Sequence, residues 1–374
     1  MSEEQAKRAL VAMSGGVDSS VAAHLMLERG YDCIGVTMKL YRNETVGLSR
    51  GHTCCTLDDV EDARGVARRL GIPYYVFNFS GDFEESVIRN FVDGYERGTT
   101  PNPCIDCNRY LKFERLLRRA LELGRQYVAT GHYARIEYDG ASGRYLLKKA
   151  LDADKDQSYV LYMLTQEQLA HTVFPLGDRT KAQVRALAEE LDFCNARKHE
   201  SQDICFVPGG DYVNFMERYT GKRYPDGDFL NLDGQVVGRH RGAVRYTLGQ
   251  RRGLNLAMGE PVYVCGKDME ANTVSVGPER ALYSRTLFAD GMNWISIPGL
   301  ERPMRVRAST RYRQRERWAT AYPEGRTGMR LEFDEPQRAM TAGQAVVLYD
   351  GDIVVGGGTI REVPPERGGS GGLC

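Results

Sequence analysis

The clearest chemical signal is a short stretch near the N-terminus, Ser14-Gly-Gly-Val-Asp-Ser-Ser20. An apolar run precedes it and an apolar-periodic segment follows it as far as Gly30, so we expect a strand, a tight turn and a helix. Glycine amides can approach a ligand closely, serine hydroxyls add donors, and the unpaired amides of a helix start favour negative charge. The stretch therefore predicts a site for a phosphate chain.

Two common phosphate-binding loops do not fit this stretch. A kinase or GTPase loop needs a lysine at its end, and no lysine lies between Lys7 and Lys39. The glycine spacing of a dinucleotide-binding loop is also missing. The stretch instead resembles the PP-loop of ATP pyrophosphatases, which hold the pyrophosphate of ATP. The alternative is a strand-helix turn whose small residues serve packing alone.

Three cysteines lie in polar or proline-rich surroundings. Cys104 and Cys107 belong to the loop Thr100-Pro-Asn-Pro-Cys-Ile-Asp-Cys-Asn-Arg109, and Cys205 belongs to Ser201-Gln-Asp-Ile-Cys-Phe206. We expect a helix to begin near Asn108. Helix-start amides and the nearby Arg109 would then lower the pKa of the Cys107 thiol and make it reactive.

Three interpretations of these cysteines remain open. Cys104 and Cys107 form half of a zinc site if His52, Cys54 or Cys55 supplies further ligands. Cys104, Cys107 and Cys205 could instead hold an iron-sulfur cluster with an open iron position. The third interpretation, which we favour, is sulfur chemistry by Cys107 and Cys205 without a metal. Cys33 and Cys194 are better explained by packing.

The elements around these residues predict an α/β fold. Strands are expected at 33–39, 74–79 and 127–130, with helices at 57–70, 82–95 and 108–123 between them. This alternation indicates a doubly wound parallel sheet with ligands outside the carboxyl ends of its strands. The residues 14–20, Met38 and Gly131-His132 all fall at such ends and are expected to converge on one nucleotide.

The C-terminal half has a different residue pattern from the N-terminal half. The pattern of residues 151–191 predicts mostly helix. After about residue 212 glycines become more frequent, and short runs of alternating apolar and polar residues predict strands, among them one at 304–313. We expect a PP-loop domain at 1–212 with a helical insertion, a small β-rich domain at 213–290, a β-barrel at 291–363 and a flexible tail at 364–374.

Composition narrows the class of protein. The chain has 374 residues, a formal net charge of zero and nine cysteines. The length suits two or three domains, and the neutral charge means that any polyanion site must be local. No signal peptide or membrane-spanning run is evident, and the cysteines do not form a secreted disulfide framework, so a cytoplasmic location without membrane contact is expected.

Taken together, the motifs resemble those of the tRNA-specific 2-thiouridylases, the MnmA/TrmU family. The resemblance runs from about residue 8 to 363 and includes Asn102-Pro-Cys-Ile-Asp-Cys-Asn108, Gly131-His-Tyr133, Lys155-Asp-Gln-Ser-Tyr159 and Tyr246-Thr-Leu-Gly-Gln-Arg-Arg-Gly-Leu254. Many members carry Asp where this chain has Cys104. The family uses ATP to replace O2 of the wobble uridine, position 34 of certain tRNAs, with sulfur.

The resemblance implies a role for each matching residue. Cys205 would carry the persulfide sulfur, and Cys107 would be the second catalytic thiol. Residues 1–212 would be the catalytic domain, and their helical insertion would bind tRNA. An ATP site, with Mg²⁺ bound together with the nucleotide, would consist of Ala12, Met13, Ser14, Gly15, Gly16, Val17, Asp18, Ser19, Ser20, Met38 and Gly131. The target base and tRNA would contact Asn102, Pro103, Cys104, His132, Lys155, Asp156, Gln157, Arg311, Tyr312 and Gln344. The sulfur would come from a persulfide donor such as a cysteine desulfurase or a relay protein.

Basic residues offer further candidate RNA contacts. The segment from Arg239 to Gly259 contains no acid, and Arg305, Arg307, Arg311 and Arg313 alternate, so one strand face would carry all four. A solvated basic face is the alternative. Two other functions also remain: an adenylating enzyme that forms an amide on a small molecule, and a non-catalytic ATP- or RNA-binding module.

Overall fold

The computed structural model describes residues 6–41, 57–198 and 204–365. These residues form two units. The first takes its described residues from the ranges 1–90, 103–215 and 352–355, and the second from the ranges 91–102, 216–351 and 356–374. The predicted tail from residue 366 onward lies outside the described residues, as do His52, Cys54 and Cys55.

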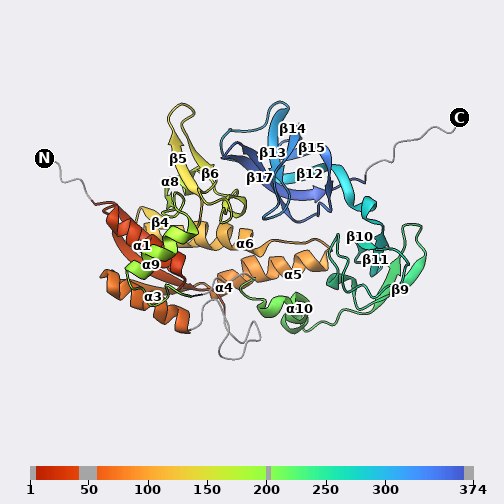
Figure 1. Ribbon diagram of the computed structural model, residues 1–374, viewed down its shortest axis with the longest axis horizontal. Coiled ribbons are helices and arrows are strands. Elements are labelled where there is room, and N and C mark those ends of the chain that lie inside the picture. The colour runs from red at the N-terminus through yellow and green to blue at the C-terminus, as the bar shows by residue number, and fades with distance from the viewer. Residues whose placement is uncertain (1–5, 42–56, 199–203, 366–374) are drawn as a thin grey trace. The chain divides into compact units, whose positions relative to one another are not determined.

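The first unit is built on a five-stranded parallel sheet (Figure 1). Its strands are β1 (Arg8–Ala12), β2 (Asp32–Lys39), β3 (Tyr74–Asn78), β4 (Tyr127–Ala129) and β7 (Thr172–Val173), in the order β3-β2-β1-β4-β7. The chain moves outward from β1 to β3 and then returns beside β1 as β4. This reversal creates a crevice at the carboxyl ends of β1 and β4, which is where ligands bind in such sheets.

Helices cover both faces of this sheet. The helical segments as far as residue 220 are α1 (Val17–Glu28), α3 (Leu57–Leu70), α4 (Ser80–Phe83), η1 (Glu84–Ile88), α5 (Arg89–Glu96), α6 (Pro103–Asp106), η2 (Cys107–Arg115), α7 (Leu116–Glu122), η3 (Ser158–Val160), α8 (Gln166–Ala170), α9 (Lys181–Glu190), η4 (Pro208–Gly210) and α10 (Tyr212–Thr220). Ala9 and Val11 of β1 pack in one core with α1, α3 and α9, whereas Leu10 packs in another core with α7. The continuous apolar run of β1 thus reflects burial on both faces, because successive side chains of a strand alternate.

Most of the expected elements of this unit are confirmed, including the helix at 57–70. A capping box formed by Thr180 and Gln183 begins α9. The mostly helical interpretation of 151–191 is wrong in part. Only α8 and α9 are α-helical there, and the short strand β7 lies between them. Before that segment the chain forms a hairpin that we did not predict, β5 (Arg135–Asp139) and β6 (Arg144–Lys148).

The second unit is rich in β-structure. A four-stranded sheet has the order β10-β11-β8-β9 and is formed by β8 (Gly227–Leu230), β9 (Val236–His240), β10 (Tyr263–Asp268) and β11 (Thr273–Gly277). A six-stranded barrel follows, closed by the pairing of its first and last strands. Its strands are β12 (Tyr283–Trp294), β13 (Met304–Ser309), β14 (Arg317–Glu324), β15 (Gly328–Arg338), β16 (Ala345–Asp350) and β17 (Ile353–Glu362). The short helical turns η5 (Ala243–Arg245) and η6 (Glu279–Leu282) precede β10 and β12. The expected α/β domain followed by small β-rich domains is confirmed.

One predicted strand ends early. Strand β13 stops at Ser309, and Arg311 and Arg313 follow it in a turn where Arg313 has a φ of +65°. The expectation that four arginines share one strand face is therefore wrong, because only Arg305 and Arg307 belong to the strand.

Candidate active site

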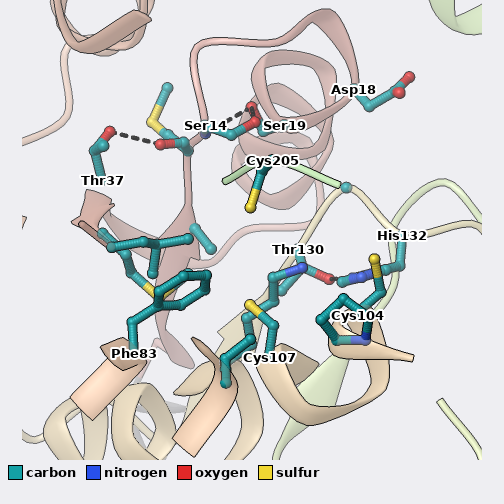
Figure 2. A pocket seen from close by; sticks show the side chains of 18 of the residues that line it. Ser14, Asp18, Ser19, Thr37, Phe83, Cys104, Cys107, Thr130, His132 and Cys205 are labelled. Carbon is teal, nitrogen blue, oxygen red and sulfur yellow. Dashed lines mark hydrogen bonds between the residues drawn. The ribbon is translucent and has the colours of Figure 1, made fainter. Parts of the chain in front are cut away.

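A cavity of about 350 Å³ opens at the carboxyl ends of β1, β2 and β4, and we call it the strand-end cavity (Figure 2). Thirteen of the predicted site residues line it: Ala12, Met13, Ser14, Asp18, Ser19, Met38, Pro103, Cys104, Cys107, Gly131, His132, Gln157 and Cys205. Gly15, Gly16, Val17, Ser20, Lys155 and Asp156 belong to the same unit but are not among its lining residues. Asn102, Arg311, Tyr312 and Gln344 belong to the second unit.

The glycine-serine turn is closed by its own hydroxyl groups. Ser19 Oγ accepts a hydrogen bond from the Ser14 amide at 3.1 Å and donates to the Gly16 carbonyl at 2.9 Å. Gly15 has a φ of +77°, and a Cβ at this position would lie 2.3 Å from the Asp59 carbonyl oxygen. Only glycine fits there. The turn thus reaches α1 with a fixed backbone, and Asp18 and Ser19 in the first turn of α1 line the cavity.

Asp18 at the start of α1 is held by two distant residues. Lys181 Nζ donates to both of its carboxylate oxygens, at 2.7 and 2.8 Å, and Tyr133 Oη donates at 2.8 Å. Lys181 is buried, at 8% exposure, although it begins α9 far along the chain. The loop that lacks a lysine of its own thus receives an ammonium group from elsewhere, and the sequence pattern did not indicate this.

The cysteines approach the strand-end cavity from different elements. Figure 2 shows Cys205 entering from the loop after the α9 region and Cys104 and Cys107 from the helical segment that starts at Pro103. Cys205 is partly exposed, and its backbone carbonyl accepts a hydrogen bond from Tyr41 Oη at 2.8 Å. Two thiols far apart in sequence therefore share one cavity with the glycine-serine turn.

The expected acidity of Cys107 is wrong. The helix begins at Pro103 and not near Asn108, so Cys107 lies a full turn inside it, at the start of the π-helical segment η2. Burial raises the pKa of the Cys107 thiol above its ordinary value, although the charge of Lys112 opposes this shift. The Arg109 guanidinium packs over the Tyr110 ring. At neutral pH the Cys107 side chain is a neutral thiol. Cys194, which we attributed to packing, is exposed.

No three His, Cys, Asp or Glu side chains within residues 6–41, 57–198 and 204–365 are arranged to hold a metal ion. Cys104, Cys107 and Cys205 therefore do not form a ligand set in this structure. The zinc interpretation involves His52, Cys54 and Cys55, which the structure does not describe.

His132 and the residues 155–157 take part in packing around the strand-end cavity. His132 Nδ1 lies 2.7 Å from Thr130 Oγ1, and its ring contacts Phe113 and Phe174. Burial, and secondarily the charge of Lys112, lowers the pKa of His132 well below 6.5, so the ring is neutral. Gln157 Oε1 accepts a hydrogen bond from the Tyr133 amide at 2.9 Å.

Two of the candidate RNA-binding arginines of the second unit, Arg305 and Arg311, have protein partners. Arg311 Nη2 donates to the Ala339 carbonyl at 2.6 Å and to Thr341 Oγ1 at 3.2 Å, and Arg305 forms a two-pronged ion pair with Asp334. Gln344 Nε2 donates to the Thr100 carbonyl at 2.6 Å. Tyr312 is 37% exposed. The charge of Arg305 is thus already compensated within the barrel.

Comparisons with known proteins show the family to which this chain belongs. Profiles described as tRNA methyl transferase HUP domain, tRNA methyl transferase PRC-barrel domain and aminomethyltransferase beta-barrel domain match residues 7–209, 213–278 and 284–360. The tRNA-specific 2-thiouridylase MnmA of Acetivibrio thermocellus is 53% identical over 95% of this chain and 99% of its own length. The chain belongs to the MnmA family of tRNA-specific 2-thiouridylases. The family member of Clostridioides difficile is 49% identical over 95% of this chain and 98% of its own length.

Solved structures give weaker likenesses. A 4-thiouridine synthetase in complex with RNA and ATP is 22% identical, with a TM-score of 0.36, over 57% of this chain and 50% of its own. The NMN synthetase of Francisella tularensis is 18% identical, with a TM-score of 0.34, over 59% of this chain and 80% of its own. In the part of the chain that the structure describes, no helix is long and apolar enough to cross a membrane.

Proposed function

We propose that this protein catalyses the ATP-dependent 2-thiolation of the wobble uridine, position 34, of tRNA and releases AMP and pyrophosphate. Family membership supports the reaction class. The observation that carries the mechanism is that Cys107 and Cys205 line one cavity with Ser14 and Ser19. An enzyme that only adenylates a small molecule needs the turn but not the two thiols.

The first step activates the base. The uracil O2 attacks the α-phosphate of ATP, pyrophosphate leaves, and the oxygen becomes part of an AMP leaving group. The residues 12–20 together with Met38 and Gly131 hold the nucleotide. Unpaired amides at the start of α1 stabilise the charge of the departing pyrophosphate. Asn102, Pro103 and Cys104 face the target base.

The second step transfers sulfur. The terminal sulfur of a persulfide on Cys205 attacks C2, and AMP leaves. Cys107 then attacks the inner sulfur, the S–S bond breaks, the thiolated base departs, and a Cys107–Cys205 disulfide remains. An external reductant restores both thiols. Because the thiolate is the nucleophile, Cys107 must first lose its proton, and Lys112 is the cation whose charge favours that loss.

A magnesium ion fits this site only as a companion of ATP. Mg²⁺ bound with nucleotides is held mainly by phosphate oxygens and water, with one or two carboxylates. Asp18 is the carboxylate at the strand-end cavity that could contribute one such oxygen. The ion would neutralise phosphate charge there.

Two macromolecular partners follow from this reaction. One is tRNA, for which we propose contacts by His132, Lys155, Asp156 and Gln157 in the first domain and by Arg311, Tyr312 and Gln344 in the last. The other is a persulfide donor that loads Cys205. We assign catalysis to residues 1–212 and propose that the domains at 213–290 and 291–363 bind tRNA.

Cysteine-to-serine variants test the proposal. Cys107→Ser and Cys205→Ser should each abolish 2-thiouridine formation, measured by mass spectrometry of digested tRNA, while ATP binding persists. Cys194→Ser is the matched control, since Cys194 is exposed and does not line the strand-end cavity. Full thiolation by Cys205→Ser would refute the sulfur-carrier role. Pyrophosphate release that does not require tRNA would favour a small-molecule substrate instead.

A further inference from the structure

Two residues that follow α9 hold the glycine-serine turn from behind. Asn195 Nδ2 donates to the Gly15 carbonyl and to Ser20 Oγ, both at 2.9 Å, and Lys198 Nζ donates to the same Gly15 carbonyl at 3.3 Å. Asn195 is 2% exposed. Neither Asn195 nor Lys198 lines the strand-end cavity. Both donors therefore reach the Gly15 carbonyl from residues that do not line the strand-end cavity.

Lys198 is itself anchored to α3. Its ammonium group lies 2.6 Å from Asp59 Oδ1 and 2.6 Å from Asp62 Oδ2. Burial alone would lower the pKa of Lys198, but the hydrogen bonds with the two carboxylates outweigh it and raise the pKa above 10.5. The ammonium group stays charged at neutral pH. The Gly15 carbonyl is thus connected to α3 through a permanent cation.

The orientation of one peptide group follows from these bonds. In a planar trans peptide the N–H points opposite to the C=O. Because Asn195 and Lys198 hold the Gly15 carbonyl, the Gly16 N–H points away from both of them. Among the described residues no hydrogen bond uses the amides of Gly16 or Val17. Two unpaired amides at a helix start form a binding site for an anion.

We propose that Asn195 and Lys198 are positioning residues that aim the Gly16 amide at the phosphates of ATP. They do not touch the nucleotide and act only through the Gly15–Gly16 peptide. This inference rests on the proposed function, because it concerns the binding of ATP. It assigns a role in ATP binding to the turn that follows α9, which lies outside the glycine-serine motif at residues 14–20.

The test uses variants of Asn195 and Lys198 that keep the approximate shape of the side chain but lack its hydrogen-bond donors. Asn195→Asp has nearly the same shape without the two N–H groups, and Lys198→Met has a similar length without the charge. Loss of one such hydrogen bond should raise both the dissociation constant of a non-hydrolysable ATP analogue, measured by calorimetry, and the KM for ATP by about tenfold. The kcat at saturating ATP should stay within about twofold. Arg197→Ala is the matched control, since its side chain is 91% exposed on the same turn.

Folded Asn195→Asp and Lys198→Met proteins that bind the analogue like the wild type would overturn the inference. A purely structural role, which would also overturn it, predicts a lower melting temperature without a change in the KM for ATP. Lys198→Arg should restore most of the affinity, because its guanidinium keeps the charge and the donors. If Asn195→Asp does not fold, Asn195→Leu removes the donors without adding a charge. A wild-type protein that binds no ATP would refute the proposed function instead.

Discussion

The approach of Gly131 to the start of α1 gives the sharpest prediction. A Cβ added at Gly131 would lie 2.8 Å from the carbonyl carbon of Asp18 and 2.8 Å from the backbone nitrogen of Ser19. Ordinary contacts begin at 3.4 Å, so Gly131→Ala must separate the end of β4 from the turn by about 0.6 Å. Both obstacles are backbone atoms that cannot rotate aside.

The expected cost follows from this displacement. Overpacking of this kind costs about 1–3 kcal/mol of stability. A misplacement that approaches 1 Å can reduce catalysis about 100-fold. We therefore expect Gly131→Ala to weaken ATP binding and to lower kcat/KM about 10- to 100-fold. Calorimetric titration with a non-hydrolysable ATP analogue and the rate of tRNA thiolation would measure both effects.

Gly140→Ala is the matched control. Gly140 lies in the turn between β5 and β6, its φ is not in the left-handed region, and an added Cβ there meets nothing within 4 Å. That variant should bind ATP like the wild type. If Gly131→Ala also did so, close contact between these two backbone segments would not be needed for nucleotide binding, and the reasoning would be refuted.

Two further predictions concern the second unit. Burial lowers the pKa of Lys267 to about 8 from 10.5, so the unfolded chain holds this proton to higher pH and the free energy of unfolding should rise between pH 8 and 10.5. Lys267→Met should remove that rise and stabilise the protein at pH 7 by up to about 3 kcal/mol in urea unfolding; an unchanged pH dependence would contradict this. Arg311→Ala should weaken tRNA binding and reduce its salt slope by about 1, and it should also destabilise the barrel by about 1–3 kcal/mol through its lost hydrogen bonds. Arg305→Ala, whose charge Asp334 already compensates, should change the slope less, and equal slopes would argue against Arg311 as a phosphate contact.

Local sequence was enough for the sheet and its turns. Strand β1 could be predicted because Ala9, Leu10 and Val11 are all apolar and all fully buried. The glycine-serine turn could be predicted because glycine adopts a positive φ without strain, as Gly15 does at +77°. In both cases the residue types of a few consecutive positions are enough to indicate the local backbone conformation.

The sequence could not reveal what depends on distant partners or on the exact start of a helix. Lys181 is 163 positions from Asp18 in the sequence, and no local sequence pattern indicates the hydrogen bond between them. The start of the helix at Pro103 was missed, although proline is well suited to the first helical position. That shift of a few residues moved Cys107 from an exposed helix end into the interior and reversed the direction of its pKa shift.

The reversed pKa shift of Cys107 bears on the order of the proposed reaction. A low-pKa thiolate would be ready to attack the persulfide on Cys205 at any time, which would release sulfur before a base is activated. A buried neutral thiol attacks only after its proton leaves, and Lys112 is the cation that lowers the cost of that loss. Burial keeps the pKa of His132 well below 6.5, so its ring is neutral at neutral pH. It therefore adds no second positive charge that would lower the pKa of the Cys107 thiol. In the reaction that we propose, burial of Cys107 would therefore favour sulfur transfer to an adenylated base over premature disulfide formation.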